Sequence, residues 1–544
     1  MVNVWLAAKV AVRSRGGVVA AQHGRAAGIG AEILRAGGNA VDAAIATSLA
    51  LGVVEPWMSG LGGGGCMLVQ LADGQAHAVD AGMVAPRRLR PADYPLAGGA
   101  AGDLFGWPAV LGDRNLHGPL AVAVPGLADG LRLAHERFGT MPLRELVAPA
   151  LALAEEGFLV DWYASQMIAG AALDLRRYPD AAAHWLPNGL PPVPPWTGAE
   201  LRLPLPTLAE TLRLLAEEGW RGFYEGGLAQ RLLADCRALG VPIEAADLAG
   251  CRARLERPLA VAYRGHDVLA MPGPFAGVTL ARCLDRLAAE EAPARLDGAT
   301  FATYARVLVD AYRERIEGDG PAPACTSHLS VVDRHGNLVA LTQTLLSSFG
   351  SKLLGPATGL LLNNGVMWFD PRPGRANSMA PGRQPLSNMC PALGRRDRQR
   401  FALGASGGRR ILPAALQLTL FLLEHGLDLE QAFRQPRLDV SGTDLVTVDS
   451  RLALELAPPE GAAVRRLAPQ VSPLLFACAS GVLDDTQRGW REGMTEPLHP
   501  WAQAVGVARC RCGRASATRR RWGPRRGGGW MRTFFSLGPR AERR

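Results

Sequence analysis

Alternating helical and strand patterns from residue 18 onward constrain the fold of this chain more than any other feature of its sequence. Residues 24–38 space apolar side chains as a helix does and end in a double glycine, and Asn39 is a suitable N-cap for the helix that follows. Hairpin patterns occupy residues 66–81 and 327–344, around Asp-Gly and His-Gly-Asn turns. Strands and helices are thus intermixed, which indicates the α/β or α+β class with sizeable sheets.

The middle of the chain is mostly helical by pattern. Residues 126–160 and 206–240 carry apolar side chains at helical spacing, and a further helix is predicted at 411–426. The Pro-rich stretch 187–205 between the first two is predicted to be a loop.

Composition is that of a globular protein. Of the 544 residues, 48% are hydrophobic and 20% are charged, which excludes a wholly disordered chain. No apolar run reaches 18 residues, so no membrane span is predicted, and we interpret the N-terminal apolar run as a strand or helix and not a signal peptide. The nine cysteines are scattered and odd in number, which argues against a disulfide framework. We therefore expect a protein of the reducing cytoplasm.

Positive charge is concentrated at the C-terminal end. Residues 508–544 hold twelve Arg and one acid, a local charge of +11, whereas the whole chain has +9, so the rest carries −2. The body therefore lacks the basic surface typical of nucleic-acid-binding proteins. Because the tail has no hydrophobic periodicity, we predict that it is disordered; an RNA- or membrane-binding arm is the less favoured alternative.

Familiar catalytic motifs are missing or out of context. The run Gly60–Gly65 matches G-x-G-x-x-G, but a helix precedes it and a strand follows, the reverse of a dinucleotide-binding turn. The chain has no H-E-x-x-H, no G-x-S-x-G and no paired C-x-x-C, and Cys510 and Cys512 have no partner pair, so zinc protease, α/β-hydrolase and zinc-ribbon sites are not indicated. His328 stands alone and is interpreted as structural.

Three nucleophilic side chains stand in a row where a Pro-rich stretch meets a strand: Cys325, Thr326 and Ser327. A threonine there is a cap or a core residue in the simplest interpretation. If the chain were cut before Thr326, the new α-amine, with a pKa near 8, could accept the proton of the threonine's own hydroxyl. Such a nucleophile needs no histidine base, which suits a sequence without a triad motif.

Several motifs in order along residues 18–507 resemble the gamma-glutamyltransferase family of N-terminal nucleophile hydrolases. They are GGNAVDAA (37–44), SGLGGGG (59–65), AVPG (123–126), FGTMPL (138–143), TSHLSVVDRHGNLVALTQT (326–344), LLNNG (361–365), PLSNMCP (385–391) and GASGGRRI (404–411). The resemblance implies a four-layer αββα sandwich, no metal and no organic cofactor. It also implies self-cleavage into a large chain, 1–325, and a small chain, 326–507, followed by the tail 508–544.

The same resemblance assigns roles to single residues. Cleavage falls between Cys325 and Thr326, and Thr326 becomes the nucleophile. Thr344 hydrogen-bonds and orients it, and Gly407 and Gly408 form the oxyanion hole with their N–H groups.

Residues that bind the charged α-carbon end of a glutamyl group in the family are changed here. Ser387 matches the family, but Gly82, Leu346, Gly365, Trp368 and Asn388 replace Arg, Asn, Gln, Asp and Ser. A buried charge without partners costs several kcal/mol, so glutathione should bind poorly unless Arg88 or Arg372 takes over the anchoring. The segments EPWMSG, WFDPRPGR and SNMCP instead resemble the branch of oxamate amidohydrolase and cephalosporin-acylase-like members.

These observations predict a self-processing amidohydrolase or acyltransferase that acts through an acyl-Thr326 intermediate on a small amide such as oxamate or a glutaryl amide. Its two chains should stay associated; assembly of such heterodimers into a homo-oligomer is left open. The alternatives are a catalytically impaired scaffold and, less favoured, a nucleic-acid binder acting through the basic tail.

Overall fold

The computed structural model describes residues 9–100, 107–315, 325–452, 455–471 and 474–507. The predictions for the tail 508–544, its two cysteines and the first eight residues lie outside these ranges.

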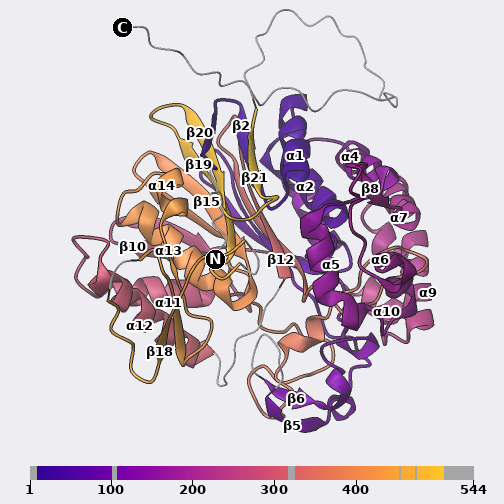
Figure 1. The fold of residues 1–544 in the computed structure, drawn as a ribbon. Helices are drawn as coiled ribbons and strands as arrows, with labels where there is room; N and C mark the ends of the chain where they lie inside the picture. The colour runs from indigo at the N-terminus through magenta and orange to yellow at the C-terminus, as the bar shows by residue number, and fades with distance from the viewer. Residues whose placement is uncertain (1–8, 101–106, 316–324, 453–454, 472–473, 508–544) are drawn as a thin grey trace, which may run out of the picture. The chain divides into compact units, whose positions relative to one another are not determined.

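Two seven-stranded antiparallel sheets form the centre of the fold (Figure 1). The first, sheet A, has the order β1 (Val12–Ser14), β20 (Trp490–Thr495), β19 (Cys478–Asp485), β15 (Gln399–Ser406), β14 (Ala392–Arg396), β11 (His266–Ala270), β10 (Leu259–Tyr263). The second, sheet B, has the order β21 (Gln503–Gly506), β2 (Gly17–Ala21), β12 (Cys325–Asp333), β13 (Leu338–Leu346), β3 (Gly64–Gln70), β4 (Ala76–Ala81), β9 (Arg254–Glu256).

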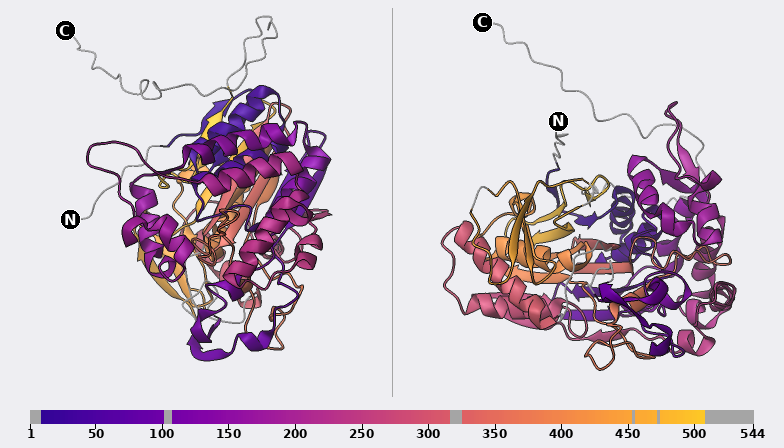
Figure 2. Two further views of the ribbon diagram at one scale, coloured as in Figure 1. Left: turned by 90° about the vertical axis from the view of Figure 1, so that its right-hand side faces the viewer. Right: turned by 60° about the horizontal axis from the view of Figure 1, so that its bottom comes forward.

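Helices cover the outer face of each sheet, as the views in Figures 1 and 2 show. Sheet B is covered by α1 (Gly24–Ala36), α2 (Ala40–Val54) and α3 (Leu127–Phe138). Sheet A is covered by α11 (Gly277–Ala288), α13 (Ile411–Leu423) and α14 (Leu429–Arg434), and α12 (Gly298–Arg315) packs against α11. The predicted αββα sandwich is thereby confirmed.

Alternation along β12 explains why its two faces meet different layers. Leu329 and Val331 belong to the core between sheet B and its helices, whereas Val332 belongs to the core that contains sheet A. Successive strand residues point to opposite faces, so Thr326 faces sheet A and Ser327 faces the helices.

Local sequence signals fix the first two helices. Gly37 ends α1 in the left-handed conformation, with φ of 106°. Asn39 caps α2 in a capping box with Asp42. Nearly every residue of α2 is buried, since it lies between sheet B and a further helical layer.

That further layer is built from the middle of the chain. Its helices are α4 (Leu143–Glu156), α5 (Trp162–Leu175), α6 (Pro179–Trp185), α7 (Pro206–Glu218), α8 (Gly222–Glu225), α9 (Gly227–Leu239) and α10 (Ala245–Ala249). Short strands lie outside the two main sheets: β5 (Leu96–Ala100) with β6 (Pro108–Val110), β7 (Phe158–Val160) with β8 (Leu201–Leu203), and β16 (Leu438–Asp439), β17 (Leu445–Asp449) and β18 (Ala463–Leu467). The β7–β8 pair corrects the prediction at two points, because residues 158–160 are not helical and residues 201–203 are not loop.

Within the described ranges, no helix has the length and apolar character needed to cross a membrane. The six cysteines described in side-chain detail are all buried and unpaired.

Candidate active site

Thr326 lies at the start of β12, in the central part of sheet B, with only 3% of its surface exposed. Its hydroxyl donates a hydrogen bond to Thr344 Oγ1 on β13 at 3.2 Å. The backbone N–H of Leu346 donates to the same oxygen at 2.8 Å. The pairing of β12 with β13 shifts register between Cys325 and Ser327, so an irregularity falls at Thr326 itself. The structure thus brings together the two threonines that the sequence singled out.

Leu346 has an unusual backbone conformation. Its φ is 85°, in the left-handed region that bulky residues avoid. This conformation carries the Leu346 N–H toward Thr344, so the strain is stored beside the nucleophile. Its side chain is buried and apolar.

The predicted oxyanion glycines follow β15 in sheet A. Gly407 and Gly408 have φ of 132° and 64°, conformations that favour glycine. The ring of His328 on β12 lies against Gly404 on β15. Cys478, which pairs with Ser406 at the end of β15, lies close enough to the buried Glu55, described below, for their charges to interact. The glycine pair and Thr326 therefore lie at the same end of the two facing sheets.

Met83 and Ala123 pack closely around Gly365, one of the positions at which the sequence predicts the loss of a glutamyl-binding side chain. A Cβ placed at Gly365 would lie 3.0 Å from both Met83 Sδ and Ala123 Cβ. Met83 also packs against Gly64, the residue paired with Thr344, which places this cluster beside the nucleophile.

The position of Gly82 is filled from elsewhere in the chain. A Cβ there would lie 1.9 Å from the Gln384 amide nitrogen, so the Gln384 side chain occupies that space. The same amide donates to Asp80 at 2.9 Å, and Arg254 also bonds to Asp80. The Asp80 carboxylate is therefore neutralised by Arg254, and no cation projects from position 82.

Ser387 and Asn388 are buried in the segment that leads into β14. Because β14 pairs with β15, this segment lies at the same sheet end as Gly407. Ser387 Oγ accepts a bond from the Met389 N–H at 3.2 Å. The Asn388 amide nitrogen and the indole nitrogen of Trp368 are buried and have no hydrogen-bond partner among the described residues. Both are donors that a bound molecule could satisfy.

Arg315 is a site residue that the sequence did not indicate. It ends α12, and its guanidinium donates to the Ser387 carbonyl at 2.6 Å and to Thr279 Oγ1 at 3.0 Å. Burial lowers its pKa. No carboxylate in the described part of the chain lies within ion-pair distance of Arg315. The two arginines suggested as substitute anchors form ion pairs with other residues: Arg88 with Glu244, and Arg372 with Asp370.

A buried polar network lies on the helix side of sheet B, directly behind the nucleophile. Ser327 Oγ donates to Glu55 Oε2 at 3.1 Å and accepts from Ser59 Oγ at 2.9 Å, and the Gln343 amide donates to Ser59 at 2.9 Å. Gln22 donates to the other oxygen of Glu55 at 3.2 Å. Burial raises the pKa of Glu55 to about 8, which keeps it protonated at neutral pH. Glu55 and Ser59 belong to the segment EPWMSG, whose sequence alone does not indicate this network.

His328 is structural, as predicted. It is buried and bonds to Thr342 and Ser330 through its two ring nitrogens at 2.8 and 3.0 Å. Burial lowers its pKa to about 3, so the ring is neutral. The described residues contain no group of three or more His, Cys, Asp and Glu side chains placed to hold a metal ion.

Comparison with known proteins agrees with this geometry. The gamma-glutamyltranspeptidase family model matches residues 26–320 and 299–458. The Acylase ACY 1 proenzyme of Pseudomonas sp. (strain V22) is 36% identical over 499 residues, covering 84% of this chain and 86% of that protein. The oxamate amidohydrolase proenzyme of Klebsiella pneumoniae is 30% identical, covering 90% and 98%.

Structural similarity extends over the same length. The crystal structure of cephalosporin acylase from Bacillus halodurans superposes with a TM-score of 0.77 at 24% identity, covering 93% of this chain and 98% of that one, and supports the fold. The Thr326–Thr344 pair and the Gly407–Gly408 pair are the arrangement that the resemblance to this family predicts, and the family model matches most of the chain. The chain therefore belongs to the gamma-glutamyltranspeptidase family, as an enzyme that hydrolyses amides or transfers their acyl groups.

Proposed function

We propose that this protein is a precursor that cuts itself before Thr326 and then hydrolyses a small acyl amide that carries a carboxylate but no ammonium group. The observation that carries the proposal is the Thr326–Thr344 hydrogen bond at the end of the two sheets where the Gly407–Gly408 pair lies.

Processing is a peptide-to-ester rearrangement. The Thr326 hydroxyl attacks the carbonyl carbon of Cys325, the C–N bond breaks, and the Thr326 amine is released while an ester forms. Water then hydrolyses the ester, which leaves a carboxylate on Cys325 and a free hydroxyl on Thr326. The hydrogen bond to Thr344 orients the attacking oxygen.

Catalysis by the mature chain reuses the same oxygen. The new α-amine takes the hydroxyl proton as Thr326 Oγ1 attacks the substrate carbonyl, and backbone N–H groups at Gly407 and Gly408 stabilise the oxyanion. The proton passes to the leaving amine, and an acyl-Thr326 ester remains. Attack by water completes hydrolysis; attack by a second amine completes transfer.

Substrate choice follows from the charges that line this end of the sheets. The buried side chains of Leu346, Met83 and Trp368 carry no carboxylate or carbonyl oxygen for an α-ammonium group. Arg315, beside the Ser387 segment, offers one positive charge that no described carboxylate neutralises. An acyl group with one carboxylate, such as oxamate or a glutaryl amide, fits this arrangement better than a γ-glutamyl group.

The test compares kcat/KM for glutaryl p-nitroanilide, γ-glutamyl p-nitroanilide and oxamate, using fully processed enzyme. We expect the glutaryl compound to exceed the γ-glutamyl compound by at least tenfold. Arg315→Met should lower kcat/KM for the glutaryl compound roughly 10- to 100-fold, as loss of one charged contact predicts, and leave the uncharged butyryl p-nitroanilide little changed. Arg282→Met, which removes a more exposed arginine on the neighbouring helix, is the matched control. A preference for the γ-glutamyl compound would show that the proposed specificity is wrong.

A further inference from the structure

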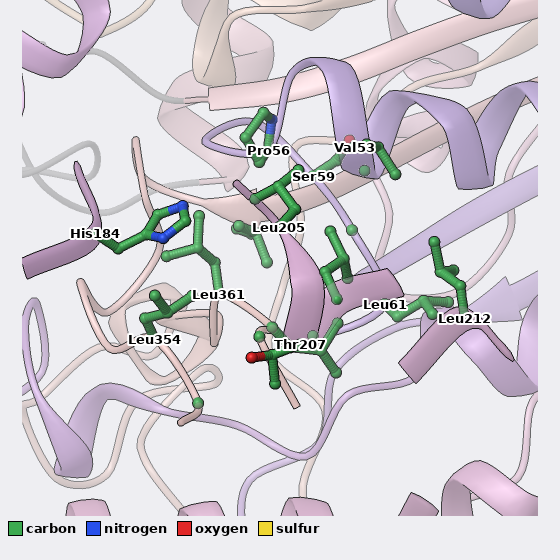
Figure 3. A pocket seen from close by; sticks show the side chains of 18 of the residues that line it. Val53, Pro56, Ser59, Leu61, His184, Leu205, Thr207, Leu212, Leu354 and Leu361 are labelled. Carbon is green, nitrogen blue, oxygen red and sulfur yellow. The ribbon is translucent and has the colours of Figure 1, made fainter. Parts of the chain in front are cut away.

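A cavity of about 450 Å³ lies on the outer side of sheet B between α2, α6 and α7. Figure 3 shows its side chains, among them Val53, Leu61, Leu212, Leu354 and Leu361. Its size falls within the range of small-molecule sites.

This cavity is separate from the proposed acyl site. Leu345 lines it, whereas the preceding residue, Thr344, points to the opposite face of β13 and bonds to Thr326. The glycine run forms part of the partition: a Cβ at Gly63 would lie 2.1 Å from the Thr344 carbonyl oxygen, and Gly60 and Gly62 line the cavity. A molecule in the cavity therefore approaches the nucleophile only from behind, through Ser59 and Ser327.

The cavity opens to solvent and selects against anions. Ala183, Pro206 and Pro356 are exposed residues of its lining and mark its mouth. Asp180, also exposed, is the only Asp, Glu, Lys or Arg among the residues that line it. His184 contributes no positive charge at neutral pH, because burial lowers its pKa. An anionic ligand would thus meet a carboxylate and no cation.

Two nitrogen atoms in the cavity wall have no hydrogen-bond partner in the part of the chain that the structure describes. The Trp185 side chain is 1% exposed, and its indole N–H has no hydrogen-bond partner among the described residues. Nε2 of the neighbouring His184, which is labelled in Figure 3, also has no hydrogen-bond partner among the described residues. A buried N–H without an acceptor is unfavourable, so a carbonyl oxygen brought in by a ligand would be stabilised here.

We propose that this cavity is a binding site for a neutral, medium-chain acyl amide, with its hydrocarbon chain among the leucines and its carbonyl oxygen on the Trp185 indole N–H. The site is distinct from the acyl-threonine chemistry and does not depend on the proposed substrate.

The first experiment titrates the full-length protein with the neutral fluorescent probe N-phenyl-1-naphthylamine and displaces it with decanamide or decanoate. We expect saturable probe binding, displacement by decanamide, and at least tenfold weaker displacement by the anion decanoate. Absence of saturable binding, or equal displacement by the two compounds, would overturn the proposal.

Variants then locate the site. Thr207→Trp at the half-exposed part of the lining and Leu212→Trp in the wall should each weaken probe binding at least tenfold, whereas Leu173→Trp on the exposed face of α5 should not. Thr207→Trp decides the matter if Leu212→Trp does not fold, as judged by its melting temperature. Trp185→Phe should weaken decanamide binding severalfold and leave the probe unaffected. Wild-type probe affinity in a folded Thr207→Trp variant, or unchanged decanamide affinity in Trp185→Phe, contradicts the assignment.

Discussion

At the residue scale, Thr326 carries both proposed reactions, and its hydroxyl is the group that Thr344 holds in place. Thr326→Ala removes the attacking oxygen, so we expect a single uncut chain of 57.7 kDa, whereas the wild type should give two chains of about 34 and 23 kDa, in proportion to their lengths. Intact mass spectrometry measures this directly. Thr326→Ser, which keeps a hydroxyl, should still be cut. Cleavage of the alanine variant at the same bond would rule out self-processing by Thr326.

Glu55 makes the stability of the protein depend on pH. Its pKa is about 8 in the fold, against 4.5 when exposed, so unfolding between these values releases a proton. The contribution of Glu55 is complete below pH 4.5 and is lost as pH rises toward 8, with a slope of up to about 1.4 kcal/mol per pH unit. Glu55→Gln keeps an uncharged hydrogen-bonding group and should flatten this part of the profile.

The measurement is the melting temperature of the uncut Thr326→Ala chain, with and without Glu55→Gln, from pH 5 to pH 8. Equal slopes in the two proteins would mean that Glu55 is ionised in the fold.

At the element scale, the connection of α1 to α2 is held by Asn39. Its side-chain oxygen accepts from the N–H groups of Val41 and Asp42 at 2.9 and 3.0 Å, and its amide nitrogen donates to the Phe138 carbonyl at 2.6 Å. Asn39→Ala should therefore lower the free energy of unfolding by about 1 to 2 kcal/mol. Asn39→Ser restores a capping oxygen and should recover part of the loss in a urea titration. An alanine variant as stable as wild type would show that the cap is dispensable.

Elements with local signals were predictable from sequence. The stops and caps at Gly37 and Asn39 and the hairpin turns gave α1, α2 and the two central hairpins, because the residues that decide them are neighbours in the chain. The β7–β8 pair was missed, because each short strand forms only by pairing with the other about 40 residues away.

Site residues divide in the same way. Thr326 and Thr344 are recognisable from sequence motifs. Glu55 and Arg315 act through tertiary contacts, which no local sequence pattern predicts. A carboxyl group becomes a neutral hydrogen-bond partner only where the fold buries it.

At the scale of the whole molecule, both sheets mix strands from either side of the predicted cut. In sheet B, β12 lies between β2 and β13, and β13 lies between β12 and β3; in sheet A, β11 pairs with β14. We therefore expect the processed chains to elute as one species near the precursor's mass in size-exclusion chromatography and to separate only in denaturant. Two separate peaks under native conditions would contradict this.

The interleaved strands also change the kinetic order of folding. The precursor folds by a first-order process, in which β12 and its neighbours β2 and β13 belong to one polymer and their effective concentration is fixed by the chain. Once the bond before Thr326 is broken, β2 and β12 belong to different molecules, and recovery from full denaturation becomes second order and dependent on dilution. Cleavage would thus turn a reversible fold into one that is maintained mainly by the height of its unfolding barrier.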